Sequence, residues 1–567
     1  LMISVRTMAS IVGSTLNVFT SSINSLFKNQ QPWEIVAITS STILFLSWAW
    51  QVYEIEESLF SRGKKKFFKL ARKIPFVSKK LETELDKIRE LFHKDTVERL
   101  QETSYCVSLP KEAKTETEIM DSLQKFLNLG EFEWEKGFIS GAIYCENKAL
   151  KNLVGEVYKL TSYTNPLHPD VFPGICFIEA DIIRMAANLF HGTHDTCGSV
   201  TSGGTESIVM ACKAYRDYAE ATKGITNPVI LLPTTAHPAF DKGCAYFKVY
   251  AKHVKVDPVT FKVDIHAMEK AISKNTILLV GSAPNFPYGT MDDIVAIAAL
   301  GRKYNIPVHV DSCLGGFLTA FMLHAGFEVE PCDFSVPGVT SISADTHKYG
   351  FTPKGSSVIL YAHPKYRHHQ YFVVADWPGG TYGSPSMNGS RTGGLIAAAW
   401  ATLLYFGFDG YVKATREIIS TTRYIEKRIR EECDDVFIFG TPATSVIAVG
   451  SNKFHIYRLV EGLKKHGWNL NTLQFPSGFH LCVTHLHTQE GVADKFIDNM
   501  KEELVKIKEN PNVKLEGMMA MYGVSHTIPD RTIVEDFARI YLDYLTFLPP
   551  EEADKEKKPS NGVLKAA

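Results

Sequence analysis

The sequence has no surplus of either charge and no residue spacing typical of a bound metal. Its 61 Lys and Arg residues nearly balance its 62 Asp and Glu residues, for a formal net charge of -1. Nothing global therefore favours nucleic acid or another polyanion as a partner. The ten cysteines form no CxxC pair and no cluster with histidine. We expect reduced thiols in a cytosolic domain, with neither a disulfide framework nor a zinc site.

Charged residues are also missing from Ile35 to Tyr53. As an α-helix this stretch would span roughly 28 Å, about the thickness of a bilayer core. Tryptophan and tyrosine side chains lie near its ends, as in the aromatic belts of membrane proteins. A buried core helix or a signal peptide would be the alternatives, but WAWQVYE offers no small-residue cleavage site. The sequence thus predicts a single transmembrane helix over residues 33–53.

Basic residues are unevenly distributed around this stretch. Upstream only Arg6 and Lys28 are basic, whereas nine basic residues follow between positions 62 and 80. Because positive charge stays on the cytosolic side of a membrane, residues 1–32 should form a short lumenal tail and the C-terminal part should face the cytosol. The basic run itself is either a solvated linker or a contact with anionic lipid headgroups.

The length of 567 residues exceeds what one core of ordinary size needs. We therefore expect one large catalytic domain, a second, smaller domain and an N-terminal appendage. The predicted divisions after the membrane helix are a basic linker and helical stalk over 54–114, an N-terminal segment contributing to the active site and dimer over 115–182, a large cofactor-binding α/β domain over 183–420, a small C-terminal α+β domain over 421–549, and a disordered tail over 550–567.

Short β-rich runs alternate with helical patterns beyond residue 183. The amphipathic pattern of 290–305 predicts a helix between two of these runs. Apolar strands alternating with amphipathic helices are typical of an α/β domain with a mostly parallel central sheet. The predicted strands cover 228–233, 276–283, 306–311, 339–345 and 356–361.

A glycine turn, TSGGTES at 201–207, opens a predicted helix. Its glycines would let the backbone approach an anion, and the helix N-terminus would offer free N–H groups. The turn lacks the GK[ST] of a nucleotide-binding P-loop. Taken alone, it could equally be an ordinary turn.

Two polar residues follow predicted strands at what should be the same edge of the sheet. Asp311 ends the strand IPVHVD, where such sheets bind ligands, and it could pair with a protonated pyridine nitrogen. His237 follows the strand PVILLP and could stack on a flat ring. Taken alone, Asp311 would be a helix N-cap and His237 a solvated loop residue.

Lys348 lies in the polar segment SADTHKYGFTPKGSS, after a β-rich run and before a glycine-containing turn. A lysine held inside an active site has its amine pKa lowered and can form a Schiff base with an aldehyde. The alternative is a surface lysine, which is the usual environment of this residue type.

The motifs TSGGTES, TTAHPAFDK, HVDSCLGG and SADTHKYG occur in an order and spacing that resemble the group II decarboxylase superfamily of fold-type-I pyridoxal-phosphate enzymes. Longer segments resemble the lyases of this superfamily that cleave phosphorylated long-chain bases, over nearly the whole chain. These segments are SYTNPLHPDVFPG, THKYGFTPKGSSV and DWPGGTYGSPSMNGSRTGG. The resemblance implies a fold-type-I large domain, a smaller C-terminal domain and pyridoxal 5'-phosphate as the cofactor.

The same resemblance assigns roles to individual residues. Lys348 would bind the cofactor covalently, Asp311 would pair with its ring nitrogen and His237 would stack on its ring. Ser390 would reach the cofactor phosphate of the neighbouring subunit, which implies an obligate homodimer with shared active sites. The residues implied to hold the cofactor phosphate within the subunit are Gly204, Thr205 and His347.

A second group of residues is implied to bind the substrate. Its members are Tyr144, Asn165, His168 and Lys354, with Tyr522 as a further aromatic candidate. A cation together with hydrogen-bond donors suits a phosphate dianion. The segment NPLHPD could instead be only a rigid turn, and Lys354 only a solvated turn residue. Ser312 and Pro238 depart from the expected pattern without removing a group that the chemistry needs.

The activity implied by the resemblance is carbon–carbon cleavage of a phosphorylated sphingoid base. A retro-aldol step would give a long-chain fatty aldehyde and phosphoethanolamine. The general base stays open among Lys348, a histidine and the substrate phosphate. The alternative is an amino-acid decarboxylase of the same superfamily. The resemblance also points to the endoplasmic reticulum membrane, with the catalytic domain facing the cytosol and no nucleic-acid partner.

Overall fold

The computed structural model describes residues 20–21, 24–25, 27–54, 63, 67–100, 105–511, 513, 515 and 530–548. The chain divides into two compact units, residues 1–62 and 63–567. The first contains the 23-residue helix α2 (Pro32–Glu54), and the second contains every predicted site residue that the structure describes.

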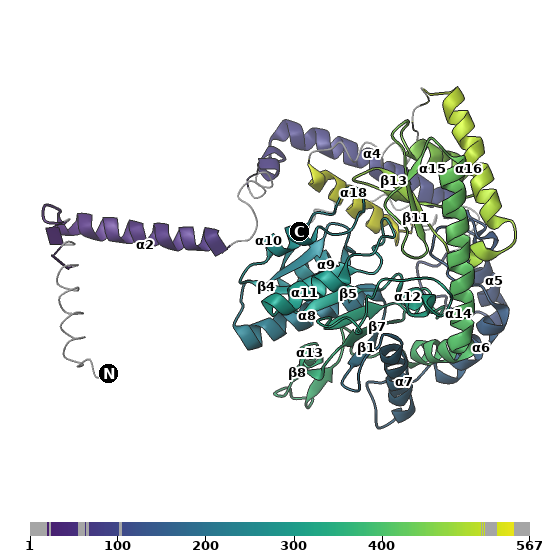
Figure 1. The fold of residues 1–567 in the computed structure, drawn as a ribbon, viewed down its shortest axis with the longest axis horizontal. Coiled ribbons are helices and arrows are strands. Elements are labelled where there is room, and N and C mark those ends of the chain that lie inside the picture. Colours follow the sequence, from purple (N-terminus) through teal and green to yellow (C-terminus); the bar gives the residue numbers. More distant parts are fainter. Residues whose placement is uncertain are drawn as a thin grey trace. The chain divides into compact units, whose positions relative to one another are not determined.

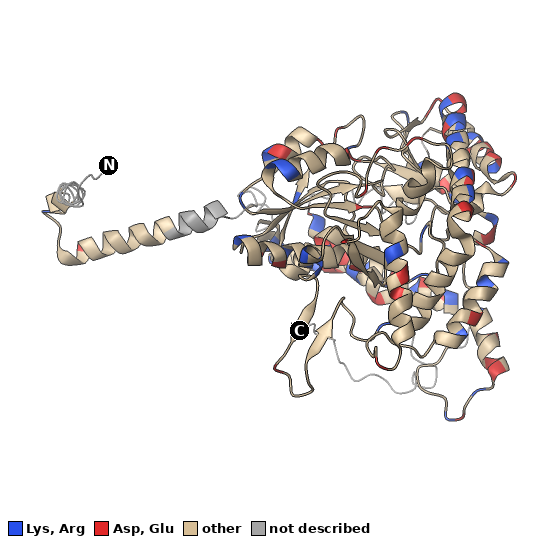
Figure 2. Ribbon diagram, turned by 60° about the horizontal axis from the view of Figure 1, so that its bottom comes forward, with Lys and Arg blue, Asp and Glu red and all other residues tan. Residues whose placement is uncertain are grey.

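Helix α2 is apolar, with one acidic residue, Glu34, in its first turn. In Figure 2 its described part is tan apart from that red turn. The described apolar part, Pro32–Leu46, is shorter than a membrane span requires. In the described part of the chain, length and hydropathy single out α14 (Gly393–Glu432) instead, but that helix packs against α6 and α7 and is a core helix. The transmembrane helix over residues 33–53 therefore stays a prediction.

A seven-stranded sheet forms the centre of the second unit, in the order β1-β7-β6-β5-β4-β2-β3. Six strands run parallel, and β7 is antiparallel to both of its neighbours. The predicted mostly parallel sheet is thus confirmed. Its strands are β1 (Cys197–Thr201), β2 (Val229–Pro233), β3 (Tyr250–Val254), β4 (Thr276–Ser282), β5 (Val308–Asp311), β6 (Ser341–Ala344) and β7 (Ser357–Tyr361).

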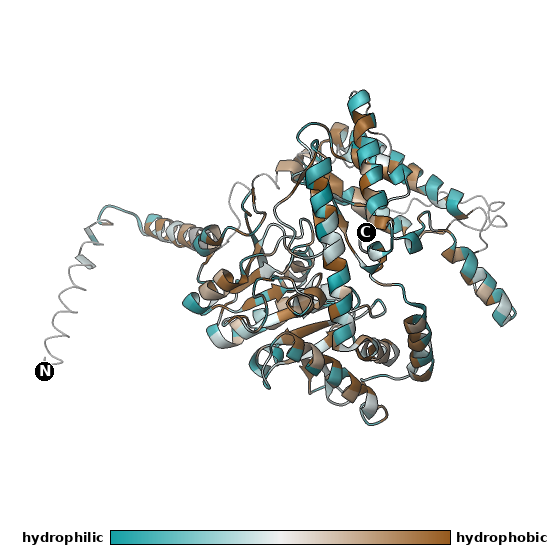
Figure 3. Cartoon of the chain, turned by 45° about the vertical axis from the view of Figure 1, so that its right-hand side comes forward, coloured by the Kyte–Doolittle hydropathy of each residue, from teal (hydrophilic) through white to brown (hydrophobic). Residues whose placement is uncertain are grey.

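Helices enclose this sheet, as Figure 1 shows for α8, α11 and α12 around β4, β5 and β7. Strands β2 and β4 are buried at every position, because both of their faces are covered. Figure 3 shows brown, hydrophobic colour in these interior strands and teal on the outer helices. The helices of this layer are α7 (Pro173–Leu189), α8 (Gly204–Lys223), α9 (Ala239–Phe247), α10 (Ile265–Ala271), α11 (Ile294–Tyr304), α12 (Gly316–Met322) and α13 (Pro364–Arg367). A two-stranded sheet of β8 (Phe372–Val374) and β9 (Tyr382–Ser384) follows.

All five strands expected from the sequence are present, with bounds shifted by at most two residues, and the helix expected over 290–305 is α11. Strands β1 and β3 were not predicted. Their sequences, CGSVT and YAKHV, lack an apolar run, and β3 lies at the edge of the sheet, where burial is incomplete.

The long helix α14 leads out of the large domain and contains residue 420, where the sequence suggested a boundary. It changes direction at Gly407, whose φ of 57° and ψ of -179° are not helical. Beyond it lies the expected smaller α+β domain, a four-stranded antiparallel sheet in the order β10-β11-β13-β12. Its elements are β10 (Phe437–Ile438), β11 (Val446–Gly450), α15 (Tyr457–Lys465), β12 (Asn471–Leu473), β13 (Gly478–Cys482), the 3-10 helix η2 (His485–Thr488) and α16 (Val492–Glu509).

The helical stalk expected within residues 54–114 contains α4 (Pro75–Leu100). The last described helix, α18 (Arg531–Tyr544), packs along it. Arg72 pairs with Asp536 of α18, and the ring of Phe92 lies 5.7 Å from that of Tyr541. The elements that follow the stalk are α5 (Glu116–Leu127), η1 (Trp134–Lys136) and α6 (Lys148–Thr161).

Candidate active site

The predicted site residues gather at the carboxyl edge of the parallel strands. In the sheet register Ser282 lies beside Asp311, and Asp311 beside Ser343. The loop that follows β6 holds Asp345 and Lys348, and the glycine turn precedes α8 at the other end of the same region. This is the edge at which open α/β sheets bind ligands.

The amine of Lys348 forms an ion pair with a residue that the sequence did not single out. Its Nζ lies 2.9 Å from Oδ2 of Asp345, whose side chain is only 2% exposed. Burial acts to lower the pKa of Lys348, but the charge of Asp345, with smaller contributions from Tyr144 and Cys313, outweighs it and leaves the pKa raised. The expectation of a lowered lysine pKa was therefore wrong for this arrangement, because it did not allow for a carboxylate three residues earlier.

The glycine turn lies directly against this ion pair. A Cβ atom at Gly204 would stand 2.7 Å from Oδ1 of Asp345 and 2.8 Å from Sγ of Cys313, so no larger residue fits. Gly203 has a φ of 151°, and a Cβ there would stand 3.3 Å from Cε1 of His347. Nε2 of His347 in turn lies 3.6 Å from Oδ2 of Asp345. The turn, the histidine and the lysine thus form one compact group.

The start of α8 fits an anionic group such as a cofactor phosphate. Gly203 gives the helix no side-chain cap, so the first backbone N–H groups have no side-chain acceptor there. The only acid in the first turn, Glu206, already accepts hydrogen bonds from the N–H groups of Ser202 and Met387. Thr205 is exposed at this helix end. These are the positions at which the resemblance places the phosphate.

Asp311 is buried and accepts two hydrogen bonds on the same oxygen. The backbone N–H of Cys313 and the hydroxyl of Ser343 donate to Oδ1 over 3.0 and 3.4 Å. Two residues earlier on β5, the ring of His309 is held by Ser341 and Ser343. Burial lowers the pKa of His309 to about 4, so this ring stays neutral. Oδ2 of Asp311 is left for a cation such as a protonated ring nitrogen.

His237 lies four residues beyond β2, at the same edge of the sheet, and is half-buried. Its Nδ1 accepts a hydrogen bond of 3.1 Å from the N–H of Ala239. A neutral ring held in this way carries its proton on Nε2. The loop fixes the orientation of the imidazole independently of any ligand.

Three buried polar atoms at this edge have no hydrogen-bond partner: Thr235 Oγ1, Ser282 Oγ and Asp345 Oδ1. Buried polar groups are normally paired, so an unpaired group needs an explanation. Each follows or ends a different strand of the sheet, and together they mark a region lined with polar groups. A cofactor with a phosphate, a ring nitrogen and an aldehyde fits the donors, the carboxylate and the amine that are present.

Two of the predicted substrate residues lie beside Lys348. The Nζ of Lys354 lies 4.6 Å from the centre of the Tyr144 ring and donates to the carbonyl of His347 over 3.3 Å. The residue is exposed at the surface, yet the loss of water around its amine, followed by the charge of Lys348, lowers the pKa of Lys354 to about 8. The ring of Tyr144 packs edge-on against Tyr349 at 4.8 Å, and burial raises its pKa. This corner of the site therefore offers the amine of Lys354, whose charge depends on pH, and the phenol of Tyr144.

The other predicted residues lie elsewhere within the chain. Oδ1 of Asn165 accepts hydrogen bonds from the N–H groups of Leu167 and Arg391, and this ties the NPLHPD segment to the loop of Ser390. His168 and Ser390 are both exposed, and Tyr522 lies outside the described residues. A cavity of about 220 Å³ includes Ser202, Ser356 and Ser390 in its lining. One chain thus places Ser390 near the glycine turn, but His168 has no described contact with Lys354.

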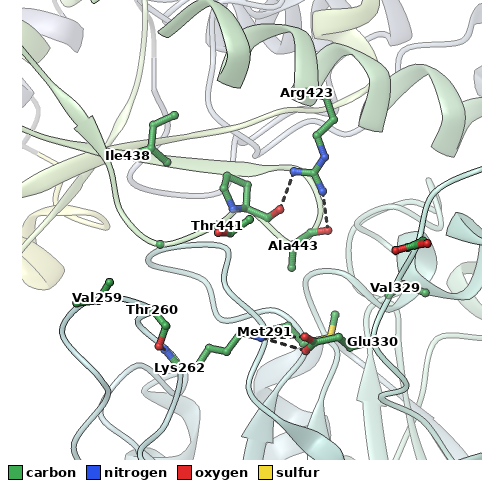
Figure 4. A pocket seen from close by; sticks show the side chains of 13 residues that line it. Val259, Thr260, Lys262, Met291, Val329, Glu330, Arg423, Ile438, Thr441 and Ala443 are labelled. Atoms are coloured by element: carbon green, nitrogen blue, oxygen red, sulfur yellow. Dashed lines mark hydrogen bonds and ion pairs between the residues drawn. The ribbon is translucent and has the colours of Figure 1, made fainter. Parts of the chain in front are cut away.

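A larger cavity than the one beside Ser390 lies away from this site. It has a volume of about 660 Å³ and is bounded by Lys262, Glu330 and Arg423 (Figure 4). Lys262 pairs with Glu330, and Arg423 donates to the carbonyls of Pro442 and Ala443. Its cations are thus already bound, and neither Lys348 nor Asp311 lines it. The volume of a cavity therefore does not identify the active site in this protein.

Comparisons with known proteins agree with this geometry. The family profile described as pyridoxal-dependent decarboxylase conserved domain matches residues 100–449. The chain is 53% identical over 537 residues to sphingosine-1-phosphate lyase of Drosophila melanogaster, which covers 95% of this chain and 98% of that relative. It is 46% identical over 524 residues to sphingosine-1-phosphate lyase 1 of Mus musculus, with 92% of each chain covered. The solved structure of a sphingosine-1-phosphate lyase from Burkholderia pseudomallei matches with a TM-score of 0.73 and 36% identity, over 79% of this chain and 99% of that one.

Proposed function

Because this chain belongs to the pyridoxal-dependent decarboxylase family and, within it, to the sphingosine-1-phosphate lyases, we propose that it cleaves phosphorylated long-chain sphingoid bases. The reaction is a retro-aldol cleavage that yields a long-chain fatty aldehyde and phosphoethanolamine. The observation on which this rests is the Lys348–Asp345 pair against Gly204, with Lys354 and Tyr144 beside it. Amino-acid decarboxylation, the alternative, is common to the wider superfamily and has no separate observation in its favour.

The residues described above account for every part of the cofactor, pyridoxal 5'-phosphate. Lys348 supplies the amine that binds its aldehyde, Asp311 the carboxylate for its ring nitrogen, and His237 a flat partner for its ring. The start of α8 and His347 would hold its phosphate. The bound cofactor supplies a protonated ring that accepts the electrons of the broken carbon–carbon bond.

The side chains of the chain itself control protons and the substrate. Asp345 lies against the amine of Lys348, and Asp311 offers a carboxylate where a ring proton would have to be retained. Lys354 and Tyr144 provide a cation and a hydroxyl for the substrate phosphate. Burial of Tyr144 and Asp345 limits the access of bulk water to the half-buried Lys348.

The test is the visible spectrum of the purified full chain before and after borohydride. We expect the absorption band of a lysine-bound cofactor. Borohydride should abolish this band and leave the cofactor covalently fixed to the protein. Lys348→Ala should lose the band and all turnover of sphingosine 1-phosphate, while Lys365→Ala, which changes a lysine of α13, should keep both. Absence of the band in the parent protein, or release of carbon dioxide from an amino acid in place of aldehyde, would refute the proposal.

We also propose that α2 anchors the chain in the endoplasmic reticulum membrane, with the catalytic domain in the cytosol. The uncharged stretch from Ile35 to Tyr53 supports this, together with the basic run that follows it and the continuous 23-residue helix. Several described side chains of α2 are exposed, such as Leu44 at 70%. Resistance to extraction by carbonate, with the C-terminus accessible to protease in sealed microsomes, is the expected result.

We further propose that the chain forms a homodimer with shared active sites. Large apolar side chains are exposed around the NPLHPD segment, with Leu160 at 83% and Tyr163 at 94% exposure, and no described contact covers them. A partner subunit would cover them and bring a second set of His168 and Ser390 side chains to the site. Leu160→Glu with Tyr163→Glu should convert a dimer into monomers by light scattering and weaken cofactor retention. An unchanged mass would contradict the proposal.

A further inference from the structure

The segment Phe67–Lys80, here called the basic–apolar segment, exposes hydrophobic side chains although it joins a well-packed body. Phe67 and Leu70 are each 65% exposed, Ile74 is 52% exposed and Phe76 is 76% exposed. Single exposed apolar residues are common on protein surfaces, but four large ones within ten positions need a partner.

The basic residues of this segment fall into two groups. Arg72 faces the protein, where it pairs with Asp536 and donates to the hydroxyl of Thr532 over 3.0 Å. The four lysines are exposed and have no acidic partner among the residues that the structure describes. They are Lys69, Lys73, Lys79 and Lys80.

The contact of Arg72 fixes which side of the segment points outward. Phe68, Ala71 and Arg72 are half-buried, and they lie on one side of the helical turn that covers residues 67–71. Leu81 and Leu85 continue the inward side along α4. The exposed rings and the unpaired lysines are therefore presented together, on the side away from α18.

We infer that the basic–apolar segment lies on the surface of an anionic lipid bilayer. Apolar side chains interleaved with lysines match an interface in which rings enter the headgroup layer and ammonium groups meet lipid phosphates and carboxylates. Three further lysines, at 64–66, precede the segment in the sequence. A protein partner would be expected to offer carboxylates in fixed positions, whereas a row of exposed lysines without a described acidic partner suits a fluid anionic surface.

This inference rests on the proposed membrane anchoring, since α2 precedes the segment in the sequence, but it concerns a separate contact. Its role would be to hold the catalytic domain in one orientation beside the bilayer. A substrate with one alkyl chain and a phosphate headgroup leaves the bilayer at that surface. Anchoring and surface contact can be tested separately. Carbonate extraction measures the anchoring by α2, and fluorophores within the segment measure its contact with the bilayer surface.

The test uses the full chain with its cofactor, reconstituted into vesicles of phosphatidylcholine alone or of phosphatidylcholine with phosphatidylserine. An environment-sensitive fluorophore is attached at Leu70→Cys or Phe76→Cys, with the exposed Cys106 changed to Ser. Leu91→Cys, at an exposed position farther along α4, is the matched control site. We expect blue-shifted emission and quenching by bilayer-embedded quenchers at 70 and 76 only in the anionic vesicles.

A charge variant completes the design. Changing the four lysines to Gln should remove the shift, since each lysine near an anionic surface strengthens contact by about fivefold. Lys427, Lys464, Lys465 and Lys495, changed to Gln, form the matched control and should leave it intact, and the cofactor band reports folding of both variants. Four results would each overturn the inference. They are equal emission in both lipids, the same emission shift at position 91, a blue shift in detergent without lipid, and an emission shift that survives in the lysine variant.

Discussion

The carboxylate of Asp345 sets the charge state of the amine on which the proposed chemistry depends. It lies 2.9 Å from Nζ of Lys348, is almost completely buried, and leaves its second oxygen without a partner next to Gly204. The raised pKa of Lys348 means that the amine is protonated at neutral pH in this arrangement. Only a neutral amine attacks an aldehyde. The ion pair with Asp345 therefore restrains the reaction of Lys348 with the cofactor.

Asp345→Asn should therefore speed covalent capture of the cofactor. Without the carboxylate, burial is the main influence left on Lys348, and burial lowers a lysine pKa. The pH dependence of capture should then move to lower pH, with a faster rate at neutral pH. The measurement is growth of the cofactor absorption after mixing with cofactor-free protein at several pH values. Asp333→Asn is the control, and an unchanged pH profile would contradict this role.

Lys354 should give substrate binding a pH dependence that arginine removes. Its pKa of about 8 means that the side chain is charged below that pH and loses its charge above it. The substrate phosphate keeps its dianionic form across this range, because its second pKa is about 6. KM for sphingosine 1-phosphate should therefore rise above pH 8 in the parent protein but stay level in Lys354→Arg.

Removal of the side chain tests the same contact without titration. A hydrogen bond to a charged group contributes about 1.5–3 kcal/mol, so Lys354→Ala should lower kcat/KM by roughly 10- to 150-fold. The cofactor spectrum should not change, because Lys354 contacts His347 only through the backbone carbonyl. Loss of the cofactor band together with activity would show a structural role instead.

How much of the site could be predicted depends on where each residue lies relative to a strand. Asp311 and His237 follow apolar runs, so the sequence could place them at one edge of a sheet. Asp345 was missed although it ends the predicted strand 339–345, as Asp311 ends the predicted strand 306–311, so the same strand-end signal was available. His309 was also missed, although a polar residue inside the run IPVHVD was a usable signal.

At the scale of elements, connection length explains what the sequence did and did not predict. Strands β2, β4 and β5 were found as buried runs, and helices separate them, so parallel pairing followed. Between β6 and β7 only the loop 345–356 intervenes, with no helix to cross the sheet. Such a short connection requires antiparallel pairing, which is what the structure has. The loop that holds Lys348 is thus the turn of a hairpin.

The break in α14 depends on a backbone conformation that other residues avoid. Gly407 combines φ 57° with ψ -179°, which costs a residue with a Cβ about 1–3 kcal/mol. Gly407→Ala should lower the free energy of unfolding by that amount in a denaturant titration. Gly410→Ala, three residues later at a position without positive φ, is the matched control and should be neutral or slightly stabilising. Equal effects of both substitutions would show that the break is not strained.

At the scale of the whole molecule, contacts between segments that are distant in the sequence were not predicted. The order of a membrane-length apolar stretch, basic run, α/β domain and smaller domain follows from composition and periodicity. The packing of α18 on α4 does not, because Arg72 and Asp536 lie 464 positions apart and only the folded chain brings them together. The four short strands of the small domain, two to five residues long, likewise give too little pattern to be counted from the sequence.

Deleting residues 1–60 should separate chemistry from substrate capture. No site residue lies in that segment, and it belongs to a different compact unit from the catalytic domain. The cofactor band and the turnover of substrate presented in detergent should therefore be retained. Turnover of substrate held in phosphatidylcholine vesicles should fall by roughly tenfold or more, because tethering raises the effective concentration of the enzyme beside the bilayer. Aldehyde production by the deleted and full-length chains, measured in both media, checks this. Complete inactivity in detergent would mean that the segment has a catalytic or folding role rather than a tethering one, whereas equal turnover in vesicles would remove the reason proposed for the anchor.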